Sequence, residues 1–116
     1  MKKKGLFVLA GLAVLAAFAA YAQQGGFTGP GIDVMTVAEA KTLRDDSPVL
    51  LRGKIERSLG KEKYLFSDAT GSITVEIERK VWGFLSVDEH DLVEISGEID
   101  RGFMKLEVEV DTIRKL

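Results

Sequence analysis

The residues of this chain best suited to chemistry lie in one short acidic segment, Asp88 to Asp91. This segment holds the only histidine of the chain, His90, among three carboxylates. Carboxylate and imidazole groups together are able to bind a divalent ion, so Asp88, His90 and Asp91 are the candidate metal ligands. Consecutive side chains of a short loop diverge, however, and a closed zinc site needs more histidine or cysteine than this chain contains. We therefore expect a solvated acidic loop, with no bound metal and no other cofactor.

No arrangement typical of an enzyme appears elsewhere in the sequence. The histidine has no obvious serine partner, the chain contains no cysteine nucleophile, and no glycine-rich phosphate loop is present. A carboxylate pair for glycoside hydrolysis would need one buried member with a raised pKa, and no segment provides that burial. We expect a protein that binds its ligand without catalysis.

An export signal precedes the elements that carry these residues. The first 22 residues, MKKKGLFVLAGLAVLAAFAAYA, begin with a basic stretch, continue with an apolar run and end on Ala-Tyr-Ala, a site of the kind that signal peptidase cleaves. The alternative is an uncleaved membrane anchor, which needs about 20 apolar residues. The alanine-rich end of the run and the polar Gln23 and Gln24 favour cleavage. We expect a signal peptide over residues 1–22 and no stable membrane insertion once it is removed.

Cleavage leaves a small acidic chain without disulfides. Removal of 22 residues from 116 leaves 94, enough for one domain with one core. The whole chain has 16 lysines and arginines against 18 acidic residues; the signal carries three lysines, so 13 remain against 18, a net charge of −5. Such a chain has no basic field that would attract polyanions.

Two segments precede the predicted sheet. Residues 23–33 begin with the glycine-rich run QQGGFTGPG, which predicts a flexible leader, and residues 34–116 form the predicted domain. Within it, Met35 to Asp46 predicts a helix. Thr36 and Glu39 have the spacing of a capping box, and the Ser-Pro dipeptide that follows Asp46 ends the helix.

Apolar and polar residues alternate from Val49 onward, the pattern of strands with one buried face. Glycines in mid-strand, Gly53 and Gly97, indicate a bulge or a bend. A break in the alternation over Arg79 to Leu85 predicts a short helical turn, and we expect its apolar side chains, Trp82, Phe84 and Leu85, to close one end of the core. The predicted strands cover residues 49–56, 63–67, 72–78, 92–100 and 103–113, with turns at 58–61, 68–71 and 101–102.

Five short strands with a helical turn between the third and the fourth favour one all-β architecture. This is the five-stranded Greek-key barrel called the OB-fold, here preceded by an extra N-terminal helix. The alternative is an open β-sandwich or an SH3-like barrel.

OB-folds bind ligands on the outer face of strands two and three, with help from neighbouring loops. The alternation predicts mostly polar side chains there and on strand one, with Leu65 among them. We expect the ligand-binding residues to be Arg52, Lys54, Ser67, Thr74, Glu76 and Glu78.

This face does not resemble a nucleic-acid site. Single strands bind to aromatic side chains set in a basic groove, whereas the predicted face has nearly balanced charge and no aromatic residue. Tyr64 and Phe66 share the parity of the core residues, and Asp68 and Gly71 have the positions that a turn requires. The outer acidic stripe of the last strand, at Glu107 and the alternate residues after it, is typical of a solubilising face, although it would attract cations weakly. We expect no nucleic-acid partner.

Four segments resemble a known family: QGGFTGP (24–30), VAEAKTLRDDSPVLLRGKI (37–55), YLFSDATGSITVEIE (64–78) and VEISGEID (93–100). The sequence is similar to the bacterial OB-fold (BOF) family, the YgiW/YdeI group of exported stress-tolerance proteins. The resemblance implies a periplasmic OB barrel of a Gram-negative bacterium, with a role in surviving peroxide, metals, acid or cationic peptides. That family defines no catalytic residues to transfer.

Two functions remain open from the sequence. The first is a periplasmic binding protein for envelope stress tolerance, whose ligand is a small cationic molecule or an envelope glycan such as peptidoglycan. The second is a structural partner of an envelope membrane protein, bound by strand pairing at an open barrel edge.

Overall fold

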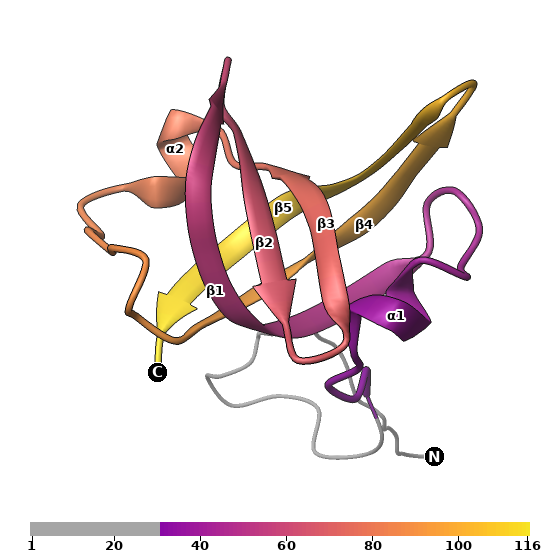
Figure 1. Cartoon of the computed structure of the whole chain (residues 1–116), viewed down its shortest axis with the longest axis horizontal. Coiled ribbons are helices and arrows are strands. Elements are labelled where there is room, and N and C mark those ends of the chain that lie inside the picture. Colours follow the sequence, from indigo (N-terminus) through magenta and orange to yellow (C-terminus); the bar gives the residue numbers. More distant parts are fainter. Residues whose placement is uncertain (1–30) are drawn as a thin grey trace, which may run out of the picture. The chain divides into compact units, whose positions relative to one another are not determined.

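Five strands form a closed barrel in the computed structural model, which describes residues 31–116 (Figure 1). The predicted signal peptide and leader residues 23–30 lie outside these described residues. The elements are α1 (Val37–Ala40), β1 (Pro48–Gly60), β2 (Lys63–Asp68), β3 (Gly71–Glu76), α2 (Arg79–Trp82), β4 (Val93–Gly102) and β5 (Lys105–Lys115).

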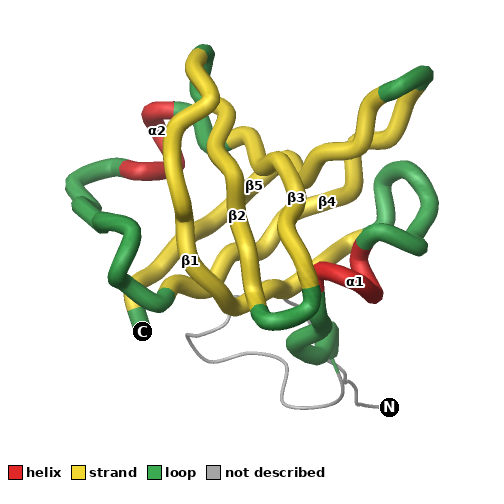
Figure 2. The backbone as a smooth tube through the Cα atoms, in the orientation of Figure 1, coloured by secondary structure: helices red, strands yellow, loops and turns green. Residues whose placement is uncertain are grey.

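The strand order around the barrel is β1-β2-β3-β5-β4, and β1 pairs with β4 to close it. All pairs are antiparallel except β3 with β5, which are parallel. The long β4 and β5 cross behind β1, β2 and β3 (Figure 2). This topology confirms the predicted five-stranded OB barrel and not the open sandwich or the SH3-like barrel.

The alternating apolar residues form the core, as predicted. Ile73, Val75 and Ile77 are at most 4% exposed, and Phe66 is fully buried. Removal of this apolar surface from water is the main favourable contribution to folding. Among residues 31–116, fourteen buried residues make up the core: Val37, Ala40, Val49, Leu51, Ile55, Phe66, Ile73, Val75, Ile77, Val93, Ile95, Ile99, Val108 and Val110.

Two glycines allow strands to approach one another closely. Gly53 is the last residue of β1 that pairs with β4, and Lys54 is the first that pairs with β2. A Cβ atom on Gly53 would lie 2.1 Å from the carbonyl oxygen of Ser67. At Gly97 the register of β4 against β5 shifts, and a Cβ there would lie 2.0 Å from the carbonyl oxygen of Glu109. Both positions require glycine for lack of space, so the predicted bend and bulge are explained.

The helix α1 is shorter than predicted. Its capping box is present: Thr36 Oγ1 accepts from the backbone N–H of Glu39, and the Glu39 carboxylate accepts from the N–H of Thr36. The helix ends at Ala40 instead of Asp46, because Arg101 of β4 donates to the carbonyl oxygens of Lys41 and Leu43, at 2.6 and 3.2 Å. The predicted last turn of helix is therefore an irregular loop that packs against β4.

Two predicted turns were misplaced. β1 continues to Gly60, and the turn into β2 is made by Lys61 and Glu62, both with positive φ. β4 continues to Gly102, so Phe103 lies in the turn and not in a strand. Neither turn has glycine or asparagine at its tip, and for this reason the usual turn residues did not reveal them.

The helical turn between the third and fourth strands was predicted correctly in place, but it spans only Arg79–Trp82. Trp82 packs against the core, as expected. Phe84 was expected to help close the core and is fully exposed. Its neighbour Gly83 has a φ of +57°, and the chain turns there, so the prediction for Phe84 was wrong.

Candidate ligand-binding site

Four of the six predicted ligand-binding residues lie on one outer face. Lys54 of β1 is the register partner of Ser67 of β2. Thr74 and Glu76 follow on β3, and Thr74 is paired with Leu65. Ser67 Oγ donates a hydrogen bond to the carboxylate of Glu56, so one of the four already has a partner within the domain.

The other two predicted residues lie apart from this group. Arg52 precedes the switch of β1 at Gly53 and faces β4, where its Nε donates to Glu94 at 2.9 Å. Arg114 donates to the second oxygen of the same carboxylate at 2.8 Å. Partial burial raises the pKa of Glu94, but the hydrogen bonds and charges of the two arginines outweigh it and hold that pKa below its usual value. Glu78 lies beyond β3, at the start of α2, 3.6 Å from Lys80.

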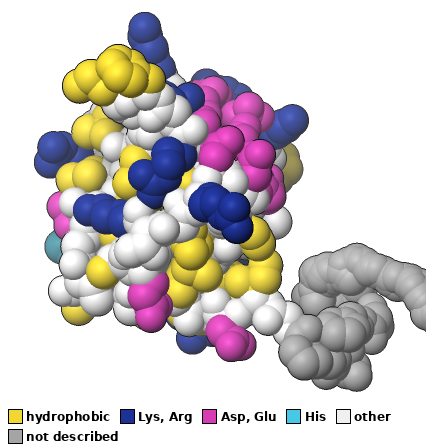
Figure 3. All heavy atoms as spheres, turned by 90° about the vertical axis from the view of Figure 1, so that its right-hand side faces the viewer, with side chains coloured by type: hydrophobic (Ala, Val, Ile, Leu, Met, Phe, Trp, Pro, Cys, Tyr) yellow, Lys and Arg dark blue, Asp and Glu magenta, His cyan; other side chains and the backbone are white. Residues whose placement is uncertain are grey.

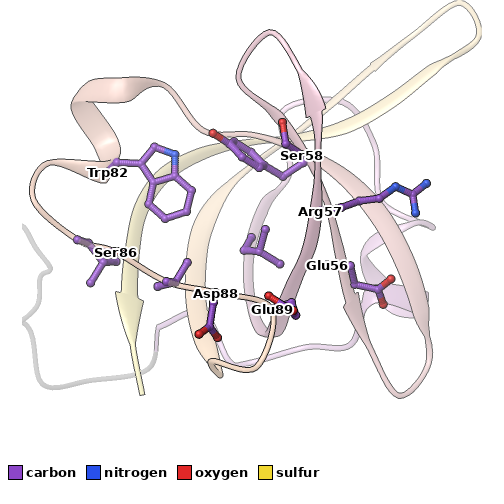
Figure 4. A pocket seen from close by; sticks show the side chains of 11 residues that line it. Glu56, Arg57, Ser58, Trp82, Ser86, Asp88 and Glu89 are labelled. Atoms are coloured by element: carbon purple, nitrogen blue, oxygen red, sulfur yellow. The ribbon is translucent and has the colours of Figure 1, made fainter.

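A cleft opens at the end of the barrel where α2 and the segment after it pass β1 (Figure 4). Its volume is about 390 Å³, within the usual size of a small-molecule pocket. β1 and β2 form one wall, and α2 with the segment into β4 forms the other. The lining residues are Ile55, Glu56, Arg57, Ser58, Tyr64, Trp82, Leu85, Ser86, Val87, Asp88 and Glu89.

An aromatic pair lies in this cleft. The rings of Tyr64 and Trp82 meet edge to face, with centroids 5.6 Å apart and an angle of 76°. Both side chains are half-buried, so each packs on the core and still borders the cleft. Tyr64 was predicted to belong to the core, and it packs against the core while remaining partly exposed.

The polar lining of the cleft is mainly acidic. Glu56, Asp88 and Glu89 supply three carboxylates, and Arg57 is the one basic residue of the lining. Figure 4 shows Asp88 and Glu89 on the segment that faces β1, while the side chains of Glu56 and Arg57 point away from Trp82. Glu56 accepts a hydrogen bond from Ser67 on that other side. A cation in this cleft would meet both aromatic rings and negative charge.

Of the candidate metal ligands, Asp88 lines the cleft and His90 and Asp91 follow it along the chain, but the carboxylates organise the loop. Asp88 accepts from the backbone N–H of His90, and Asp91 accepts from the backbone N–H of Asp88, both at 2.8 Å. His90 is exposed, and its Nε2 is 3.6 Å from Glu89. Among residues 31–116, no three histidine, cysteine or acidic side chains converge on a point where an ion would bind.

The cleft was not predicted from the sequence. The residue types could have suggested it, because tyrosine and tryptophan carry a polar group and are seldom fully buried. Trp82 is the only tryptophan of the chain and lies where the strand pattern breaks. Its proximity to Tyr64, 18 residues earlier, depends on how the chain returns across the barrel end.

In the part of the chain that the structure describes, no helix has the length and apolarity to cross a membrane.

The sequence profile of the family described as "Bacterial OB fold (BOF) protein" matches residues 14–115. The chain belongs to the BOF family. It is 45% identical over 127 aligned positions to protein YgiW of Escherichia coli strain K12, with 98% of each chain covered. A solved structure of this family, that of YgiW from E. coli, covers 80% of the present chain and all of its own, with 46% identity and a TM-score of 0.72.

A further BOF relative carries a more specific name. The calcium-regulated OB-fold protein CarO of Pseudomonas aeruginosa is 33% identical over 104 residues, covering 88% of this chain and 90% of its own. OB-fold families are typically made up of binding proteins.

Proposed function

We propose that this chain is a periplasmic binding protein that takes a small cationic ligand in the Tyr64–Trp82 cleft and so contributes to envelope stress tolerance. One observation carries the proposal: the cleft combines an edge-to-face aromatic pair with the carboxylates of Asp88 and Glu89, while Glu56 and the single arginine point away from Trp82. The proposal moves the site from the outer face predicted by the sequence to the end of the barrel.

The chemistry of the cleft favours a cation. Aromatic faces attract ammonium and guanidinium groups, and carboxylates on the rim supply long-range attraction. The hydrophobic parts of Ile55, Leu85 and Val87 add an apolar lining, which suits an organic cation better than a hydrated metal ion. An amine, a quaternary ammonium compound or the side chain of a cationic peptide fits this description.

The alternative function, strand pairing with an envelope protein, has less support. Within residues 31–116 every strand of the barrel has a neighbour on both sides. An added strand needs a row of unpaired backbone groups, and a closed barrel offers few. The predicted glycan ligand is kept as a competitor in the experiment.

The experiment is a titration followed by amide and indole NMR shifts. The full-length gene product is expressed and purified after any processing in the cell, and its N-terminus is determined by mass spectrometry. The probes are choline, spermidine, a cationic peptide, calcium chloride and a soluble muropeptide. We expect choline, spermidine or the peptide to move the Trp82 indole N–H and the amides of residues 86–89.

Two variants make the result specific. Trp82→Leu is expected to weaken cation binding at least tenfold, whereas Phe84→Leu, an exposed aromatic outside the cleft lining, should leave it unchanged. Shifts confined to Lys54, Ser67 and Thr74 would return the site to the outer strand face. No response to any of the three organic cations would refute the proposal.

A further inference from the structure

The hairpin of β4 and β5 extends beyond the barrel (Figures 1 and 2). β3 pairs with β5 only through Glu107, Val108 and Glu109. The preceding residues of β5 pair with β4 alone, up to the last pair of Gly102 with Lys105. The end of this hairpin, from Gly102 to Lys105, is therefore held by its own two strands, while Arg101 just before it also bonds to the loop after α1.

The tip presents two large apolar side chains to water. Phe103 is 94% exposed and Met104 is 91% exposed. Arg101 and Lys105 flank them, so the tip sequence Arg-Gly-Phe-Met-Lys carries two positive charges and no acid. The chain beyond the predicted signal has a net charge of −5. At this tip the acidic residues Asp100 and Asp45 stand behind the two cations, on the side of the barrel, and Phe103 and Met104 stand in front of them.

The backbone of the turn at the tip has a positive φ at a residue that is neither glycine nor asparagine. Met104 has a φ of +54°, a region that favours glycine and asparagine and in which other side chains are uncommon. Two-residue hairpin turns usually hold small polar residues. Here the turn instead keeps phenylalanine and methionine, although neither contributes to the core.

The guanidinium of Arg101 has carbonyl oxygens as its partners, and the Asp45 carboxylate accepts from the backbone N–H of the same residue. The guanidinium donates to two backbone carbonyl oxygens, those of Lys41 and Leu43, so it is held in place. Lys105 forms an ion pair of 2.9 Å with Asp100. Figure 3 shows the face of the molecule that lies on the right in Figure 1. Lysine and arginine side chains cross the middle of this face, and acidic side chains lie to their upper right.

We propose that the β4–β5 tip inserts Phe103 and Met104 into the surface of an anionic lipid bilayer. Apolar side chains flanked by basic ones are the pattern of interfacial membrane binding: the apolar groups enter the boundary of the acyl chains and the cations meet anionic headgroups. This surface is separate from the Tyr64–Trp82 cleft, and the inference does not depend on the cationic ligand.

A protein partner fits this tip less well than a membrane does. A stable protein interface buries about 800 Å² on each partner, far more than two side chains at the end of a narrow ribbon provide. A bilayer needs no matching surface, because each apolar side chain that leaves water contributes independently.

The test uses the lack of cysteine in the chain. Met104→Cys is labelled with the environment-sensitive dye NBD, and Phe84→Cys, an exposed aromatic position on another element, is the matched control. Vesicles of phosphatidylethanolamine with phosphatidylglycerol are added to the full chain. We expect the dye at position 104 to shift to the blue and brighten several-fold, while the dye at position 84 does not change. Because the signal comes from the tip itself, binding through the N-terminal segment would not imitate it.

Unlabelled protein provides a second measurement. Phe103→Ser combined with Met104→Ser should reduce co-sedimentation with these vesicles at least tenfold relative to Phe84→Ser, and vesicles of phosphatidylcholine alone should bind more weakly. Both changes lie on exposed side chains, so folding measured by circular dichroism should be unaltered. An unchanged dye at position 104, or cross-linking of the tip to one envelope protein in place of lipid, would overturn the proposal.

Discussion

The carboxylate of Asp68 accepts a hydrogen bond of 2.9 Å from the backbone N–H of Val37, the first residue of α1. Its other oxygen accepts from the backbone and the hydroxyl of Thr70. Thr70 Oγ1 accepts in turn from the N–H of Ala38. The turn between β2 and β3 therefore holds the start of the N-terminal helix, which the sequence alone suggested was capped only by its own Thr36.

Asp68→Ala should destabilise the domain by about 1–2 kcal/mol, the usual effect of removing a capping acceptor. Partial burial raises the pKa of Asp68, but its hydrogen bonds with Thr70, Val37 and Gly71 outweigh this and hold the pKa below its usual value. The stabilisation is therefore present above the unfolded pKa and is lost as the pH falls through the lower folded one. Urea unfolding at pH 7 and pH 3 measures this loss. Asp68→Asn, which keeps an acceptor, is the control, and equal losses for both variants would contradict the capping role.

Glu98→Gln should stabilise the domain at alkaline pH. A hydrogen bond with Asp111, partial burial and the charges of Asp111, Glu109 and Asp46 together raise the pKa of Glu98 to about 7. The expectation that no segment would raise the pKa of a paired carboxylate was therefore wrong. The folded state therefore favours the protonated carboxyl of Glu98. The stabilisation of the domain by this carboxyl is fully present below its unfolded pKa and is lost as the pH rises through 7. Solvent screening limits the gain at pH 8 to about 1 kcal/mol, and it should vanish below pH 4. Thermal unfolding of this variant beside the exposed Glu89→Gln checks the difference, and a gain that does not vary with pH would argue against it.

Gly97→Ala should be severely destabilising. Its Cβ would lie 2.0 Å from the carbonyl oxygen of Glu109, and paired backbone cannot move aside as a flexible side chain does. We expect a loss of about 3 kcal/mol or more. Gly31→Ala, where nothing lies within 4 Å, is the matched control. The measurement is denaturant unfolding of both variants beside the unmodified protein. If all three unfolding curves coincide, the strands separate easily at Gly97 and the prediction is wrong.

Export predicts a defined N-terminus. Mass spectrometry of the protein purified from cells should find a chain that begins at Gln23, because the Ala-Tyr-Ala site before it has small residues at both required positions. Replacement of Ala22 by leucine should leave the segment attached. An intact N-terminal segment on the unmodified protein in a cytosolic fraction would refute the proposed location.

Local patterns predicted most of the fold. Ile73, Val75 and Ile77 face inward because alternate residues of a strand lie on one face, and Thr36 with Glu39 forms its capping box over one turn of chain. Features that join distant segments were missed. Arg101 ends α1 from 60 residues away, and no pattern near Lys41 shows that its carbonyl has such a partner.

The same distinction separates the fold from the candidate site. The sequence by itself determined the family, the five strands and the core, because hydrophobic alternation and turn residues act between near neighbours. Only the tertiary structure decided that Arg52 is bound to Glu94, that Tyr64 meets Trp82 in an acidic cleft, and that Phe103 and Met104 lie exposed at the end of a projecting hairpin. The physical reason is that closure of the barrel sets which side chains from distant strands meet, and closure depends on the register of all five strands together.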